Sequence, residues 1–316
     1  MDHKRKKLNY QLHMERNAYM FITPFFVIYF IFNLFPIISS LFLSFFEWDG
    51  MGPMNFVGLE NYIKMFTSDP YFLMSIKNTV ILMLLYIPVS IIAGLIMANI
   101  LSSALLKCKR FFQVVNYFPY IITPVAVGLI FYILFDWSSG TVNKVLLSTG
   151  LIEVGINWLG TENYARLVVG LMLSWKNVGY CMMLYLAAIA AIPQELYEAA
   201  RVDGANAIQT FRHVTLPLLR PITLFVTTTS IINGFQLFDE VKMLMGNSTV
   251  GMAVIGGPNR SCLTAVWNLY DTAFGFTSGT QRMGYGSAVA YGLFMFILLV
   301  SLINYLVTGR KDKAEL

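Results

Sequence analysis

Six long apolar stretches constrain this chain more than any other feature of its sequence. Each one reaches the roughly 20 apolar residues that an α-helix needs to cross the hydrocarbon core of a bilayer. Only 12% of the residues are charged, whereas a typical soluble domain has about 25%. The sequence therefore predicts an all-α, polytopic membrane protein with six transmembrane helices. These helices are expected over residues 18–46, 79–102, 112–135, 165–192, 222–245 and 284–308.

The basic residues predict the orientation of these helices. Of the 22 Lys and Arg residues, 14 precede residue 18, lie in the loops at 103–111 and 193–221, or follow residue 308. Positively charged loops stay on the cytoplasmic side, so both termini are expected in the cytoplasm. The first stretch exceeds the apolar region of a secretory signal, which has about 7–15 residues. We therefore expect a cytoplasmic tail at 1–17, a six-helix membrane domain at 18–309 and a second cytoplasmic tail at 310–316.

The sequence predicts no catalytic residues, no metal site and no cofactor in this chain. Its three cysteines, Cys108, Cys181 and Cys262, are far apart, which argues against a disulfide framework or a zinc site. A phosphate-binding P-loop requires a lysine directly after its second glycine. Gly246 and Gly251 have suitable spacing, but a methionine occupies the lysine position. Any unit that hydrolyses ATP is therefore expected to be a separate chain.

The predicted cytoplasmic loop at 193–221 has the pattern of two short helices. In the first, Leu196, Ala199, Ala200 and Asp203 recur at helical spacing on one face, which is small in its middle. We expect Gly204 to break this helix, a second helix to run from Asn206 to about Val214, and Pro217 and Pro221 to end it. The residues alone leave two interpretations open: a docking element for another protein, or an amphipathic loop on the membrane surface.

The same loop resembles the EAA motif of ABC importer permeases. The resemblance is carried by Glu198-Ala199-Ala200, by Gly204 four residues after Ala200, and by Leu216-Pro217. In that family this loop is the coupling helix, which sits in a cleft of the ATP-binding subunit. Further segments are similar to the carbohydrate-uptake branch: Asp203-Gly204-Ala205, the Leu-Pro-Leu-Leu-x-Pro ending of the loop, Gly256-Gly257-Pro258, and Gly58-Leu59-Glu60-Asn61-Tyr62. One departure is the stretch between Met245 and Gly256, which is longer than in typical members.

The resemblance implies a type I ABC importer permease in the cytoplasmic membrane of a prokaryote, translocating a sugar or oligosaccharide. It implies four kinds of partner: the lipid bilayer, a second homologous permease, two ATP-binding cassette subunits that hold ATP and Mg²⁺, and an extracytoplasmic solute-binding protein. No nucleic acid is expected to bind. Coupling to the ATPase is expected from Glu198, Ala199, Ala200, Asp203, Gly204 and Pro217.

Polar residues inside two predicted spans indicate where a solute passes. On the fourth span, Lys176, Asn177 and Tyr180 form one patch; on the fifth, Thr229, Asn233 and Gln236 share a face. Such groups serve either as hydrogen-bonding glue between helices or as contacts for a polyhydroxylated solute. In maltose-type permeases the solute contacts lie on these two helices, so the resemblance favours a substrate-binding role for the matching positions, Asn177, Tyr180, Thr229, Asn233 and Gln236. Lys176 is added to this set as a cation that a neutral disaccharide would not require. Lys176 would serve an acidic sugar or pair with an acid of the partner permease.

Other kinds of transporter are the competing interpretations. A permease for a polyamine, a glycerol phosphate ester or a peptide differs from the leading interpretation only in its solute. A secondary transporter commonly has an inverted repeat and buried acids, and we expect neither here. A membrane enzyme would place a catalytic set of side chains at one depth, and the predicted spans contain no such set.

Overall fold

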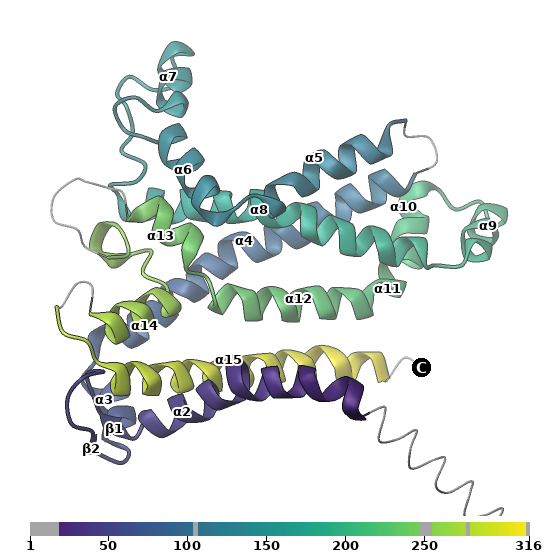
Figure 1. Cartoon of the computed structure of the whole chain (residues 1–316). Helices are drawn as coiled ribbons and strands as arrows, with labels where there is room; N and C mark the ends of the chain where they lie inside the picture. Colours follow the sequence, from purple (N-terminus) through teal and green to yellow (C-terminus); the bar gives the residue numbers. More distant parts are fainter. Residues whose placement is uncertain (1–18, 104–106, 247–254, 276–278, 314–316) are drawn as a thin grey trace, which may run out of the picture.

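Helices account for nearly all of the regular secondary structure in the described residues (Figure 1). The computed structural model describes residues 19–103, 107–246, 255–275 and 279–313. Four helices in these residues are long and apolar enough to cross a membrane: Tyr19–Leu43, α4 (Pro70–Ser102), α8 (Glu162–Ala190) and Met283–Leu306 within α15 (Met283–Lys313). Two bent helix pairs raise the number to six when each pair counts as one span. The predicted all-α membrane architecture is confirmed.

The central pair of helices is α4 and α8, which make the most extensive helix–helix contact in the described chain. Gly94 of α4 allows this approach, because a Cβ atom added there would lie 2.6 Å from Cβ of Cys181 on α8. Small residues at such positions let membrane helices pack closely, where the hydrophobic effect gives little drive. Met172 and Leu173 of α8 are fully buried in this core.

The first and last spanning helices lie side by side along one edge of the molecule (Figure 1). The first comprises Tyr19–Leu43 and includes a π-helical segment, η1 (Phe30–Leu34), followed by α2 (Phe35–Leu43). The hydroxyl of Tyr291 on α15 donates to the carbonyl of Ile37. No residue in the apolar window of this first helix is buried within the chain, so most of its surface is left for lipid or for another protein.

The third predicted span is not one straight helix. It consists of α5 (Lys109–Ile121) and α6 (Pro124–Leu134), which meet at an angle of 96°. Helical backbone angles are disfavoured for the residue before a proline, and Thr123, directly before Pro124, is extended (φ −60°, ψ 142°). The prediction of a single helix over 112–135 was therefore wrong at this point.

The fifth predicted span, 222–245, is also divided. Helix α12 (Arg220–Phe235) ends well before residue 245, and α13 (Asp239–Met245) follows after a short non-helical break. Phe238 in this break has φ −146° and ψ −70°. Asp239 and Glu240 occupy the first turn of α13, where carboxylates are favoured by the helix dipole. A new helix start therefore lies inside what the hydropathy pattern predicts as one span.

The segments that join the spans carry their own secondary structure. The first holds a short antiparallel ladder of β1 (Phe46–Glu47) and β2 (Asn55–Phe56), then α3 (Glu60–Thr67). Asp69 caps α4 by accepting hydrogen bonds from two backbone amides, so this helix begins nine residues before its predicted start. The later segments contain α7 (Thr141–Ser148), η3 (Pro258–Arg260) and α14 (Ala265–Phe274). The stretch at 247–254, where the longer outer loop was noted, lies outside the described residues.

Candidate translocation cavity and coupling loop

The loop between α8 and α12 contains two helical segments separated by a glycine turn. Helix α9 (Gln194–Val202) ends at Gly204, whose φ of +75° is the left-handed conformation that glycine adopts without strain. The second segment, Ala207–Leu218, comprises α10 (Ala207–Thr210), η2 (Phe211–Thr215) and α11 (Leu216–Leu218). Asn206 starts it with a capping box, in which its side chain and that of Gln209 exchange hydrogen bonds with each other's backbone amides.

The second segment is longer than its predicted end near Val214. Pro217 lies inside it rather than beyond it, and the chain turns by 65° only between Leu218 and Arg220. A proline provides no N–H for the carbonyl four residues before it. The π-helical turn η2 directly precedes this position and shifts the hydrogen bonding, with the amide of Leu216 donating to the carbonyl of Phe211. The prediction that Pro217 ends the helix was therefore wrong.

The predicted coupling residues differ in their exposure to solvent. Glu198, Ala199, Asp203 and Gly204 are exposed, but Ala200 is buried. A Cβ atom at Gly204 would meet no other atom within 4 Å. The face available to a partner is thus formed by α9 and its glycine turn, without Ala200. The hydroxyl of Tyr197 lies 3.2 Å from that of Thr215, which ties α9 to the second segment from the inner side.

A polar cavity of about 460 Å³ lies between the helices on either side of this loop. Its walls come from α4, α5, α8, the end of α12, the break after it and the start of α13. Its lining residues are Tyr86, Tyr120, Leu173, Lys176, Asn177, Asn233, Gln236, Leu237, Phe238, Asp239 and Glu240. Pockets of this size with a few convergent polar groups are the usual form of a small-molecule site.

Four of the six predicted solute residues line the cavity: Lys176, Asn177, Asn233 and Gln236. Tyr180 does not line it, but its ring stacks on that of Tyr120 at 4.8 Å between centroids, so it supports a lining residue. The hydroxyl of Thr229 donates to the carbonyls of Phe225 and Val226 within its own helix, and Thr229 is absent from the lining. The structure thus brings four of the predicted residues together and leaves two outside.

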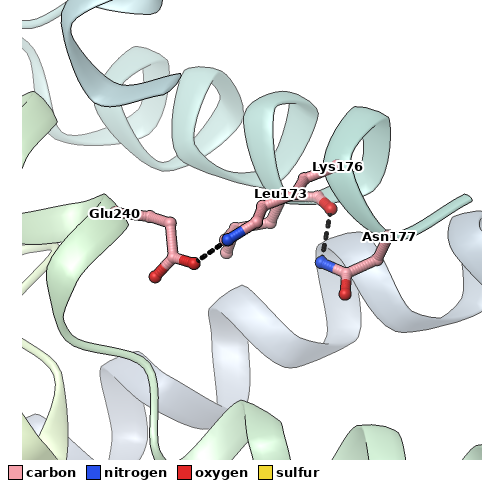
Figure 2. A network of polar contacts seen from close by, with 4 residues as sticks. All are labelled: Leu173, Lys176, Asn177 and Glu240. Carbon is pink, nitrogen blue, oxygen red and sulfur yellow. Dashed lines mark hydrogen bonds and ion pairs between the residues drawn. The ribbon is translucent and has the colours of Figure 1, made fainter. Parts of the chain in front are cut away.

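Lys176 forms an ion pair across the cavity wall with Glu240 (Figure 2). Its position is the midpoint of α8, about 21 Å from either end at 1.5 Å per residue. The side chain of Lys176 is 11% exposed and that of Glu240 is 15% exposed. Beside it, the amide of Asn177 donates to the carbonyl of Leu173, one turn earlier in α8. An acid of this same chain therefore satisfies the buried lysine.

Sequence reasoning missed Glu240, Asp239, Tyr86 and Tyr120 as lining residues. The expectation that the spans hold no buried acid was wrong, because Glu240 is largely buried beside Lys176. A signal was present, since two adjacent acids lie inside the predicted span 222–245. Ionisable residues at such positions normally face a cavity or an opposite charge. A buried lysine on one span and acids on another were therefore candidates for a pair.

The comparisons with known proteins agree on one family. The family described as "Binding-protein-dependent transport system inner membrane component" matches residues 87–312. A probable ABC transporter permease protein, YurN of Bacillus subtilis, is 33% identical over 93% of this chain and 97% of its own length. The arabinooligosaccharides transport system permease protein AraP of the same organism is 34% identical over 92% of this chain and 88% of its own. The lactose transport system permease protein LacF of Rhizobium radiobacter is 33% identical, with coverage of 92% and 93%.

The solved structures agree with this fold. A chain of a bacterial ABC transporter involved in the import of the acidic polysaccharide alginate matches with a TM-score of 0.81. The match covers 96% of this chain and 99% of that one, at 22% sequence identity. At this identity the likeness concerns the arrangement of the helices.

Proposed function

Because the chain belongs to the family of binding-protein-dependent transport system inner membrane components, we propose that it is the membrane-spanning permease subunit of an ATP-driven importer of a sugar or oligosaccharide. One structural observation carries this proposal. The helices that enter and leave the coupling loop, α8 and α12, both contribute polar side chains to one cavity. Movement of the loop is thereby connected to the place where a solute would bind.

The solute class rests on the relatives and on the chemistry of the lining. Relatives that align over nearly the whole chain are named for the transport of arabinooligosaccharides and of lactose. The cavity offers the amides of Asn177, Asn233 and Gln236, which can donate to and accept from sugar hydroxyls. The half-buried ring of Tyr120 provides apolar surface against which sugar C–H groups can pack.

Coupling to ATP hydrolysis is assigned to α9 and the glycine turn that follows it. Their exposed residues, Glu198, Ala199, Asp203 and Gly204, form a small surface that carries two carboxylates. Such a surface suits a close-fitting groove with basic residues in a partner protein. The partner is a separate ATP-binding cassette subunit, and that subunit binds ATP and Mg²⁺. The permease itself catalyses no covalent reaction.

Two more partners complete the proposed importer. A second, homologous permease would cover the part of this chain that is left open, including the uncovered helix Tyr19–Leu43. An extracytoplasmic binding protein would deliver the solute. A structural neighbour with a TM-score of 0.80 was solved as a "bacterial alginate ABC transporter in complex with alginate pentasaccharide-bound periplasmic protein", and this supports the arrangement.

The test is a reconstituted importer in proteoliposomes, assembled from the permease pair, the ATPase and the binding protein. We expect ATP-dependent accumulation of a labelled oligosaccharide, and ATPase activity that rises when the loaded binding protein is added. If accumulation continues without the ATPase subunit, or if no oligosaccharide from a broad panel is accumulated, the proposed function is wrong.

A further inference from the structure

The one positive charge in the lining of the cavity is paired with an acid of the same chain, and a second acid gives the lining a net negative charge. Lys176 is the one basic residue among the described residues that line it, while Asp239 and Glu240 are both acidic. Formally, these three side chains carry one positive and two negative charges. The part of the cavity that this chain contributes is therefore not a receptor for anions.

The ion pair compensates the positive charge that Lys176 would otherwise present to a solute. Its ammonium group contacts the carboxylate of Glu240, and both side chains are nearly enclosed. Breaking a buried pair by withdrawing one partner is strongly unfavourable, because it leaves an uncompensated charge in a poorly solvated site. An acidic sugar that bound Lys176 would have to displace Glu240, and the displaced carboxylate would then lie beside Asp239 and the incoming acid.

Uncharged groups dominate the rest of the lining. Asn233 and Gln236 at the end of α12 are exposed, and the half-buried Tyr120 contributes to the lining from α5. These groups pair with hydroxyls without requiring any charge on the ligand. A neutral oligosaccharide could use all of them while the ion pair stays intact.

We propose that the Lys176–Glu240 pair, together with Asp239, restricts this cavity to uncharged oligosaccharides and excludes acidic ones. This inference rests on the proposed function and names the solute class of the same site. Glu240 acts here as a specificity-determining residue, since it occupies the only cation among the described lining residues that could otherwise bind a carboxylate.

The experiment compares two probes of equal length, fluorescently labelled maltotriose and fluorescently labelled trigalacturonate. Their binding to the complete importer in nanodiscs is measured at equilibrium, without the binding protein, so that delivery does not impose its own selectivity. For the wild-type protein we expect maltotriose to bind at least tenfold more tightly than trigalacturonate. In Glu240→Gln, where Lys176 becomes unpaired, we expect this preference to fall at least tenfold.

Asp239→Asn is the matched control. It removes one negative charge from the adjacent residue, which also lines the cavity, but leaves Lys176 paired. Its effect on the preference should be several times smaller than that of Glu240→Gln. Lys176→Met/Glu240→Gln removes the pair without freeing a cation and should still reject trigalacturonate. Assembly of each variant is checked by size-exclusion chromatography. If Glu240→Gln does not assemble, the proposal is judged from the probe preferences of the wild type and the double variant.

Distinct results would overturn the two proposals. Equal binding of both probes by the wild type, or an unchanged preference in an assembled Glu240→Gln complex, would exclude charge selection by this pair. If Glu240→Gln and Asp239→Asn change the preference for maltotriose equally, the selectivity depends on the net charge of the cavity alone. The proposed role of the Lys176–Glu240 pair would then be wrong. If the wild type binds neither probe and no oligosaccharide stimulates transport, the proposed sugar function fails instead.

Discussion

Tyr185 of α8 donates its hydroxyl hydrogen to Thr223 of α12, with 3.2 Å between the two oxygens. Both residues lie close to the coupling loop, one on the helix that enters it and one on the helix that leaves it. Tyr185 is completely buried in a small apolar cluster that also contains Met182, Ile189 and Leu219. This cluster packs together the ends of the two helices that adjoin the coupling loop.

Tyr185→Phe tests the hydrogen bond. The change removes one hydroxyl but keeps the ring, so we expect the free energy of unfolding to fall by about 0.5–1.5 kcal/mol. Leu219→Ala, in the same cluster, should cost about 2–5 kcal/mol because it leaves a cavity. Thermal unfolding of the purified protein in detergent measures both changes. A larger loss in Tyr185→Phe than in Leu219→Ala would contradict this account of the cluster.

Gly204→Leu and Glu198→Lys should uncouple ATP hydrolysis from transport. The first adds bulk to an exposed small surface, and the second reverses a charge on it. We expect uptake to fall at least tenfold while the permease still assembles. Gly150→Leu is a matched control, because Gly150 also has positive φ (+70°) and open space around its Cβ position, but lies outside the coupling loop. Uptake and ATPase activity are measured together, and wild-type uptake in both loop variants would exclude the docking role.

Asn233→Leu and Gln236→Leu remove hydrogen-bonding groups from the cavity while keeping similar bulk. Each lost hydrogen bond to a neutral ligand costs about 0.5–1.5 kcal/mol, so we expect transport to weaken by roughly three- to tenfold with basal ATPase activity unchanged. Thr229→Val is the control, since the hydroxyl of Thr229 bonds within α12 and does not line the cavity. If the two leucine variants lose assembly or thermal stability rather than transport, these amides serve as contacts between helices.

Cysteine labelling tests the predicted orientation. In a background without Cys108, Cys181 and Cys262, a cysteine at position 139 should react with an impermeant maleimide added to intact cells. A cysteine at position 313 should react only after the cells are opened. Ser139 suits this purpose because its side chain is exposed and its hydroxyl contacts only the neighbouring Asp136 in the described structure. If position 313 is labelled in intact cells, the prediction that the C-terminus is cytoplasmic is wrong.

The sequence predicts the number and approximate place of the spans because hydropathy reports the sum of apolar side chains over a window. It does not predict the bends, because a bend depends on a few backbone angles. The 96° turn before Pro124 lies within an almost continuous apolar stretch. The helix break at Gly204 was predictable, since a glycine directly after a helical pattern is a local signal.

For a related reason, the sequence predicts four of the eight polar residues that line the cavity. Lys176 and Asn177 stand out as polar residues in the middle of a long apolar helix. The hydropathy pattern predicts one helix where the structure has α12 and α13, and this places Glu240 at the far end of a span rather than in a cavity wall. Tyr86 and Tyr120 give no signal by themselves, since tyrosines occur throughout the apolar stretches. Their place in the lining depends on how α4 and α5 pack against α8.

The two connections of the coupling loop to the membrane differ mechanically. On the entering side, α8 is one uninterrupted helix of 29 residues, about 43 Å long, and it would transmit a displacement as a stiff rod. On the leaving side, the chain has one joint between Leu218 and Arg220 and another at Gln236–Phe238. A displacement of α9 would then move α8 along its own axis. On the other side, rotation of α12 about these two breaks would take up part of the same displacement. The two walls of the cavity would thus shear past each other instead of moving together.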